Sequence, residues 1–208
     1  PIMKDAEAID RADLVLMEST YGGRLHRARE DTIEELGEIL TSARSRQGNI
    51  LVPAFSIGRS QEILYQLGKH YEAWDLGRFR IFLDSPMAVE TSRVYWEYSH
   101  LYDEEATRLR FDHDGMPLLP NLQLSRAAEE SMAINEIRSG AIVIAGSGMC
   151  NGGRIVHHLK HNLGRAETQV LITGYQAQGT LGRRLVDRDR TVHIHGQDIP
   201  VRATVHTL

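Results

Sequence analysis

The chain has 208 residues, of which 41% are hydrophobic and 25% are charged, so it has the composition of an ordinary globular protein with enough apolar residues for a core. Its single cysteine, Cys150, excludes a disulfide framework and favours a reducing, cytoplasmic setting. The net charge of −4 argues against a uniformly basic nucleic-acid binder, and no apolar run approaches the ~20 residues of a membrane span.

The first half of the chain alternates strand-like and helix-like patterns. Strands are expected at the short apolar runs 13–18, 49–55 and 79–84. Helices are expected at 30–46, at 60–71 and from Pro86 to about Tyr98, with Ser85 as the N-cap of the last. Residues 100–121 are the least regular part, with a loop expected at 111–121.

The second half continues the alternation. Helices are expected at 125–140, 152–163 and 180–187, and strands at 141–145 and 168–173. Residues 191–208 alternate in the manner of antiparallel strands. Strands separated by helices predict the α/β class, with a mainly parallel sheet covered by helices on both faces, that is, a three-layer sandwich.

Charge is unevenly distributed along this order of elements. Residues 146–190 hold seven Lys and Arg against three Asp and Glu, whereas the rest of the chain holds 17 against 25. A local positive surface on an acidic protein suits a partner that carries phosphate. The alternative is a solvated helix face, and charge alone does not decide between the two.

Parallel sheets of this class bind ligands at the carboxyl ends of their strands. The five turns expected there are rich in Gly, Ser or Thr, or carry an Arg. They are ESTYGG, PAFSIGR, LDSPMA, AGSGMCNGGR and TGYQAQG. In the fourth turn, glycines free the backbone to present N–H groups at a helix start, where the helix dipole also attracts anions. We therefore expect an anion-binding loop, with Arg154 available to grip a phosphate; the alternative is a tight packing turn.

Other chemistry is less well supported by the residues. The glycine turn fits neither the dinucleotide fingerprint nor the P-loop. Cys150 at a helix start could have a lowered pKa and act as a nucleophile, although no base partner is identifiable. The pairs His157/His161 and His193/His195 have spacings compatible with metal binding, but surface histidines are the more common explanation. Glu18, expected at a strand end, is either a catalytic acid or a cap for nearby amides.

Six motifs in order resemble the β-CASP group of metallo-β-lactamase-fold nucleases, which process RNA. They are LVLMESTYGGRLH, LVPAFSIGRSQEILYQL, IFLDSPMAVE, AIVIAGSGMCNGGRIVHHLKHNL, VLITGYQAQGTLGRRL and IPVRATVHTL. The resemblance runs from about Asp13 to Leu208. It implies a Rossmann-like β-CASP domain that closes over a metallo-β-lactamase domain holding two zinc ions. RNA would lie between the two domains, and endonucleolytic and 5′-exonucleolytic cleavage are both compatible with the motifs.

The resemblance assigns roles residue by residue. Glu18 matches the acidic residue near the metal centre and is the catalytic candidate. The residues expected to bind RNA or phosphate are Arg59, Ser85, Gly146, Ser147, Gly148, Met149, Gly152, Gly153 and Arg154. The zinc-binding H-x-H-x-D-H string is absent, so no metal ligand is expected in this chain.

These assignments predict a part of a longer protein. We expect residues 1–12 to be a remnant of the metallo-β-lactamase domain or a linker, 13–195 the β-CASP domain, and 196–208 a strand returning to the other domain. The expected partners are RNA and the missing metallo-β-lactamase domain of the same chain, with a homodimer possible and no membrane contact. The alternatives are a nucleotide- or phosphate-binding regulatory module without hydrolase activity and a structural dimerisation domain.

Overall fold

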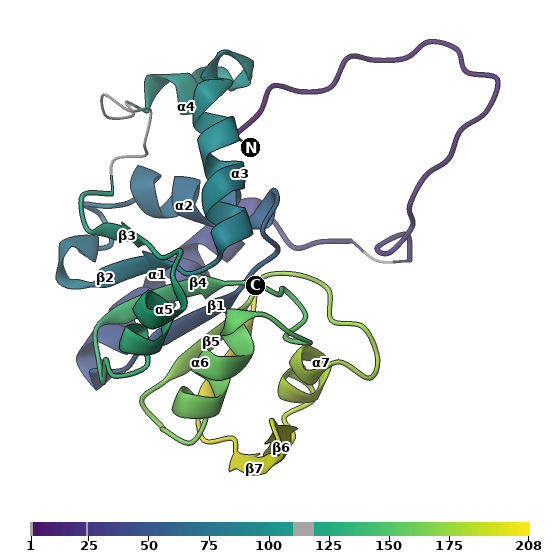
Figure 1. Ribbon diagram of the computed structural model, residues 1–208. Helices are drawn as coiled ribbons and strands as arrows, with labels where there is room; N and C mark the ends of the chain where they lie inside the picture. Colours follow the sequence, from purple (N-terminus) through teal and green to yellow (C-terminus); the bar gives the residue numbers. More distant parts are fainter. Residues whose placement is uncertain (1, 24, 110–118) are drawn as a thin grey trace.

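The fold is built on one six-stranded parallel sheet. The computed structural model describes residues 2–23, 25–109 and 119–208, and the sheet has the strand order β3-β2-β4-β1-β5-β8 (Figure 1). The strands are β1 (Ile50–Pro53), β2 (Arg80–Leu83), β3 (Leu122–Leu124), β4 (Ala141–Ala145), β5 (Gln169–Ile172) and β8 (Thr204–Thr207). All neighbouring pairs in this sheet are parallel, which confirms the predicted α/β class.

Side chains alternate between the two faces of the sheet and enter two separate cores. Ile50, Val52 and Ile142 join one core, while Leu51 and Val143 join the other. The first core is covered by α1 (Arg29–Arg46), α2 (Arg59–Lys69) and α3 (Pro86–Glu97). The second is covered by α5 (Ala128–Ile134), α6 (Arg154–Asn162) and α7 (Leu181–Val186). The predicted three-layer sandwich is therefore confirmed.

Short elements fill the connections between these layers. They are the 3-10 helices η1 (Leu76–Arg78) and η2 (Ser99–Leu101), helix α4 (Glu104–Arg108), and strands β6 (Thr191–Ile194) and β7 (Gln197–Pro200). The prediction for the C-terminal residues was partly wrong. Strands β6 and β7 form the expected antiparallel hairpin, but β8 pairs with β5 in parallel at the edge of the main sheet. The loop predicted at 111–121 falls largely outside the described residues.

Local signals placed several helix boundaries correctly. Ser85 caps α3 as predicted, because its Oγ accepts a hydrogen bond from the backbone N–H of Ala88, and Pro86 occupies the first turn. Helix α5 is shorter than the 125–140 predicted. It begins at Ala128, where the carboxylate of Glu130 in its first turn accepts the backbone N–H groups of Arg126 and Ala127.

The strand predicted at 13–18 is wrong. The N-terminal segment, residues 4–18, leaves the body beside Leu101, arcs away from α3 and returns toward the sheet (Figure 1, purple). Leu14, Val15, Leu16 and Met17 are between 72% and 88% exposed. An apolar run becomes a strand only where a neighbouring strand satisfies its backbone and its apolar face is buried, and the described residues offer this segment neither.

Candidate functional site at the carboxyl edge of the sheet

Four loops meet at one edge of the sheet, because β2, β4, β1 and β5 are adjacent and parallel. They are the continuations of these strands at 53–59, 83–88, 145–154 and 173–179, which the sequence predicted to lie together. The fifth predicted turn, 18–23, does not follow a strand. Glu18, Thr20 and Tyr21 nevertheless reach the same edge, because the N-terminal segment returns there.

The loop between β4 and α6, Gly146–Gly153, is called the glycine loop. It is closed by hydrogen bonds from Ser147 N to Gly152 O (3.0 Å) and from Ile155 N to Gly146 O (3.0 Å). Gly153 has a φ of 73°, and a Cβ there would lie 2.3 Å from the Gly146 oxygen, so only glycine fits. The N–H groups of Gly148, Met149, Gly152 and Gly153 have no acceptor among the described residues and can serve a ligand.

Neighbouring loops hold the glycine loop from both sides. Gln176 donates from Nε2 to the carbonyls of Gly148 (2.9 Å) and Gly174 (3.1 Å). The N–H of Gly182 at the start of α7 donates to Met149 O (3.1 Å). The Phe55 ring lies against Gly148, where a Cβ would come within 2.7 Å of Cδ2. The loop is therefore fixed by contacts that join β1, β4 and β5.

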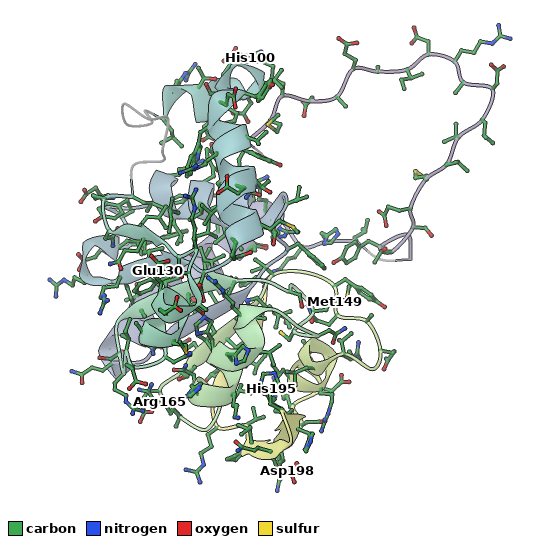
Figure 2. The ribbon with its side chains drawn as sticks, in the orientation of Figure 1. His100, Glu130, Met149, Arg165, His195 and Asp198 are labelled. Carbon is green, nitrogen blue, oxygen red and sulfur yellow. The ribbon has the colours of Figure 1, made fainter. Side chains whose placement is uncertain are left out.

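A pocket of about 340 Å³, called the strand-end pocket, opens beside the glycine loop. Its walls are Glu18, Thr20, Tyr21, Pro53, Ala54, Phe55, Arg59, Gly148, Met149, Thr173, Gly174 and Tyr175. Met149 lies on the side of the molecule to which the N-terminal segment returns (Figure 2). The volume is in the range of small-ligand sites, and the wall combines aromatic, charged and backbone polar groups.

Four of the predicted site residues lie in this pocket together. They are Glu18, Arg59, Gly148 and Met149. Ser85 lies next to the pocket, with its Oγ 3.1 Å from Ser56 Oγ, and a Cβ on Gly146 would meet both hydroxyls within 3.7 Å. Gly152 borders open space. Sequence reasoning missed Ser56, Phe55, Tyr175 and Gln176, although all four lie within turns that it had singled out.

Arg59 and Glu18 bring opposite charges to the strand-end pocket. Arg59 is exposed at the first residue of α2, and no ion pair links it to a carboxylate in the described ranges. Glu18 is also exposed, and its carboxylate accepts the backbone N–H of Thr20 at 2.9 Å. That backbone hydrogen bond, with a second from the Thr20 side chain, lowers the pKa of Glu18, so the carboxylate is ionised near neutral pH.

Arg154 does not face the pocket. Its Nη1 lies 2.7 Å from Asp84 Oδ1 and 3.2 Å from Ser125 O, and its Nη2 lies 2.7 Å from Arg126 O. Asp84 is fully buried. Burial alone would raise its pKa, but hydrogen bonds from His158, Ser125, Ser131 and Arg154 outweigh this and lower it to about 2. The side-chain charge of Arg154 is therefore compensated inside the protein.

The hypothesis of a reactive Cys150 is wrong. The thiol is buried, and burial raises its pKa to about 12, so it is protonated at neutral pH. The observed contact between histidines joins one member of each predicted pair. The ring of His157 lies against that of His195, with 4.6 Å between their centroids (His195 is labelled in Figure 2). Among the described residues, no group of three or more His, Cys, Asp or Glu side chains could hold a metal ion.

One positive charge of the segment 146–190 is compensated from outside it, because Arg154 is paired with Asp84. The pairs Arg183–Asp187 and Arg184–Asp189 lie within the segment, and their carboxylates are already included in the sequence count. In the described parts of the chain, no helix is long and apolar enough to cross a membrane. The chain is an α/β protein with an open parallel sheet, and the carboxyl edge of that sheet presents unpaired loop amides and an exposed arginine, the groups with which proteins of this class bind ligands.

Comparison with known proteins identifies the family within that class. Residues 60–185 match the Beta-Casp domain, and the chain therefore belongs to the Beta-Casp family. This confirms the resemblance drawn from the six motifs.

Three relatives are similar to the chain along nearly all of its length. The chain is 41% identical over 208 residues to Ribonuclease TTHA0252 of Thermus thermophilus, covering all of this chain and 48% of that protein. It is 29% identical to an RNase J-like protein of Methanocaldococcus jannaschii, covering 95% and 45%. It is 32% identical to the transcription termination factor FttA of Thermococcus kodakarensis, covering 95% and 32%. The chain thus spans less than half the length of these relatives.

Proposed function

We propose that this chain is the RNA-binding β-CASP part of a zinc-dependent, metallo-β-lactamase-fold ribonuclease that hydrolyses phosphodiester bonds during RNA processing or decay. Membership of the Beta-Casp family and the similarity to proteins named ribonucleases support the proposal. The observation that carries it is the strand-end pocket, which combines an exposed guanidinium, an exposed carboxylate and unpaired loop amides.

In this proposal Arg59 and the glycine loop bind the RNA backbone. The planar guanidinium of Arg59 can donate two parallel hydrogen bonds to one phosphate. The amides of Gly148 and Met149, which line the same pocket, supply further donors without adding bulk. Ser85 and the remaining residues of the glycine loop shape the pocket edge beside Gly148 and Met149.

Glu18 has a different role, because an ionised carboxylate repels a phosphate. A carboxylate and a phosphate can share a pocket where positive charge offsets their repulsion. Arg59 supplies one such charge. We infer that the pair of zinc ions supplies the rest and is held by a second domain, because the described residues offer no ligand set of their own. Glu18 would then orient a group near those ions instead of touching the RNA.

The second domain of this proposal has candidate contact surfaces on the chain. The apolar side chains at 14–17 are exposed, as are Met87, Val94 and Tyr98 along α3, which are between 49% and 63% exposed. The N-terminal segment arcs away from α3 (Figure 1), so a domain seated between them would cover both. Domain limits of 1–12, 13–195 and 196–208 remain a proposal, as does a homodimer.

The test is RNA affinity measured across a salt series. A short single-stranded RNA should bind the complete protein, and Arg59→Ala should reduce the slope of log affinity against log salt by about 0.7, the value for one phosphate contact on a single strand. Arg78→Ala is the matched control. Arg78 is also exposed, but it lies at the end of η1, before β2 begins, and it pairs with Asp75. It should leave the slope unchanged.

Two results would count against the proposal. One is the absence of RNA binding by the complete protein. The other is tight binding of a mononucleotide that RNA does not displace, which would favour the regulatory nucleotide-binding module. Zinc analysis and an RNA cleavage assay on the complete protein test the catalytic part separately, and cleavage that persists after removal of zinc would contradict it.

A further inference from the structure

A buried polar cluster lies behind the glycine loop and has no place in the proposed RNA contacts. We call Asp84, Ser131, Arg154 and His158 the Asp84 cluster. Asp84 Oδ1 accepts from Arg154 Nη1 at 2.7 Å. Asp84 Oδ2 accepts from Ser131 Oγ at 2.6 Å and lies 2.6 Å from His158 Nε2. Because an ionised carboxylate can only accept, Nε2 of His158 carries the proton of that bond.

The cluster ties four segments of the fold together. Asp84 directly follows β2, Ser131 lies on α5, and Arg154 and His158 lie one turn apart on α6. Arg154 also reaches the carbonyl of Arg126 in the turn between β3 and α5 (2.7 Å). His158 is held on its other side, where Nδ1 lies 2.8 Å from Asn135 Oδ1. The first turn of α6 is therefore anchored to the neighbouring strand and helix.

That anchor controls the glycine loop through the chain itself. Arg154 follows Gly153, the residue whose positive φ makes the bend into α6. The next N–H, that of Ile155, closes the loop onto Gly146 O at 3.0 Å. A shift of the Arg154 backbone would therefore move the free amides of Gly152 and Gly153. Through the closed loop it would also move Gly148 and Met149, which line the strand-end pocket.

The side chain of Arg154 has little left to offer a phosphate. Both terminal nitrogens are engaged by protein oxygens, and the side chain is 20% exposed. Its charge faces a carboxylate that is ionised throughout the neutral range. Arg59 has the opposite character, since it is exposed and lines the pocket.

We propose that Arg154 and Asp84, supported by His158, are positioning residues that hold the glycine loop in its binding conformation, and that Arg154 is not itself a phosphate ligand. This rests on the proposed function, because it concerns how the same site binds RNA. A positioning role would make Asp84 and His158 important for RNA binding although neither side chain reaches the surface.

The two roles of Arg154 differ in salt dependence. A direct phosphate contact contributes about 0.7 to the salt slope on single-stranded RNA, whereas a positioning residue changes affinity and leaves the slope intact. In the complete protein, Arg154→Ala and Asp84→Asn should each weaken binding of a short single-stranded RNA by roughly tenfold, the effect of losing about one hydrogen bond to the ligand. Both should keep the wild-type slope.

Arg154→Lys tests the geometry without removing the charge. Lysine has a single ammonium group and cannot reach Asp84 and the Arg126 carbonyl in the way that the guanidinium fork does. We expect it to bind RNA about as weakly as Arg154→Ala does. The double variant Arg154→Ala/Asp84→Asn should be no weaker than either single variant, because both changes break the same link.

Controls separate this proposal from a general loss of stability and from failure of the proposed function. Leu40→Ala removes a fully buried side chain in α1, on the other face of the sheet, and should lower the melting temperature without weakening RNA binding. Arg59→Ala should lower the slope. If wild type does not bind RNA, the proposed function fails. If wild type binds and Arg154→Ala lowers the slope, or neither Arg154→Ala nor Asp84→Asn alters affinity, or lysine restores binding, the positioning role is refuted.

Discussion

Gly148 and Gly152 belong to the same loop but differ in their surroundings, which makes Gly148→Ala and Gly152→Ala a matched pair. A Cβ on Gly148 would lie 2.7 Å from Cδ2 and 2.8 Å from Cε2 of Phe55, closer than carbon atoms approach. A Cβ on Gly152 would meet nothing within 4 Å, and neither residue has a positive φ. The constraint on Gly148 is therefore the aromatic ring that lies against it.

The size of the effect follows from what can move. Overpacking a filled site costs about 1–3 kcal/mol. The Phe55 side chain is 46% exposed and can swing outward, so we expect the low end, about 1 kcal/mol. For a domain of this size that corresponds to a fall in melting temperature of about 2–4 °C. Because Phe55 and Gly148 both line the strand-end pocket, the ring would move into the space proposed for RNA.

The assay is RNA filter binding across a salt series, with thermal melting as the folding control. Gly148→Ala should fold and weaken RNA binding by roughly tenfold, about 1.4 kcal/mol, while Gly152→Ala should match wild type in melting temperature. Gly148→Val should weaken binding further, because a β-branched side chain adds bulk at the same point. If Gly148→Val melts like wild type and binds RNA equally well, the glycine loop is a packing turn and its assignment to RNA is refuted.

Four further predictions concern the loop, the buried cluster, the catalytic candidate and the isolated chain. Gly153→Ala should cost about 3 kcal/mol or more, because it adds strain at a φ of 73° and places a Cβ 2.3 Å from the Gly146 oxygen; a melting temperature like that of Gly152→Ala would contradict this. The pKa of Asp84 is lowered from 3.8 to about 2, so its contribution to stability is complete above about pH 4 and is lost as the pH falls toward 2. Wild type should therefore lose about 2 kcal/mol over this interval that Asp84→Asn does not lose, measured by urea unfolding at each pH; parallel curves would show that Asp84 is not the titrating group. In the complete protein, Glu18→Gln should lower single-turnover cleavage far more than RNA affinity, and an unchanged rate would make Glu18 merely structural. The 208-residue chain alone should bind no stoichiometric zinc and cleave no RNA, which metal analysis and a cleavage assay can check; stoichiometric zinc with turnover would refute it.

The sheet was predictable because its strands carry their own signal. Residues 141–145 and 50–53 are short, continuous apolar runs bounded by turns, and such runs form the centre of a parallel sheet. The run at 14–17 is equally apolar but stays outside the sheet. A strand also requires a partner, and the sequence does not state where that partner is. Local composition therefore predicts which segments can be strands but not which are paired.

The location of the candidate site was predictable to the level of its loops but not of its side-chain contacts. Glycines and strand ends marked the carboxyl edge correctly. Arg154 was assigned to phosphate because a cation beside glycines at a helix start is typical of anion sites, yet Asp84, its partner, is 70 residues away in the chain. Phe55 and Gln176 were missed for the same reason, since each acts on Gly148 from another strand-end loop.

The strand order has a consequence for how the chain folds. Strand β4 pairs with both β1 and β2, but it begins at Ala141, about ninety residues after β1 begins at Ile50. During synthesis β1 and β2 therefore exist for a long interval without the strand that joins them, with backbone groups and apolar faces unsatisfied. The glycine loop follows β4 directly. The strand that joins β1 to β2 thus also delivers the loop, so the proposed RNA-binding edge forms only when the central pairing of the fold is made.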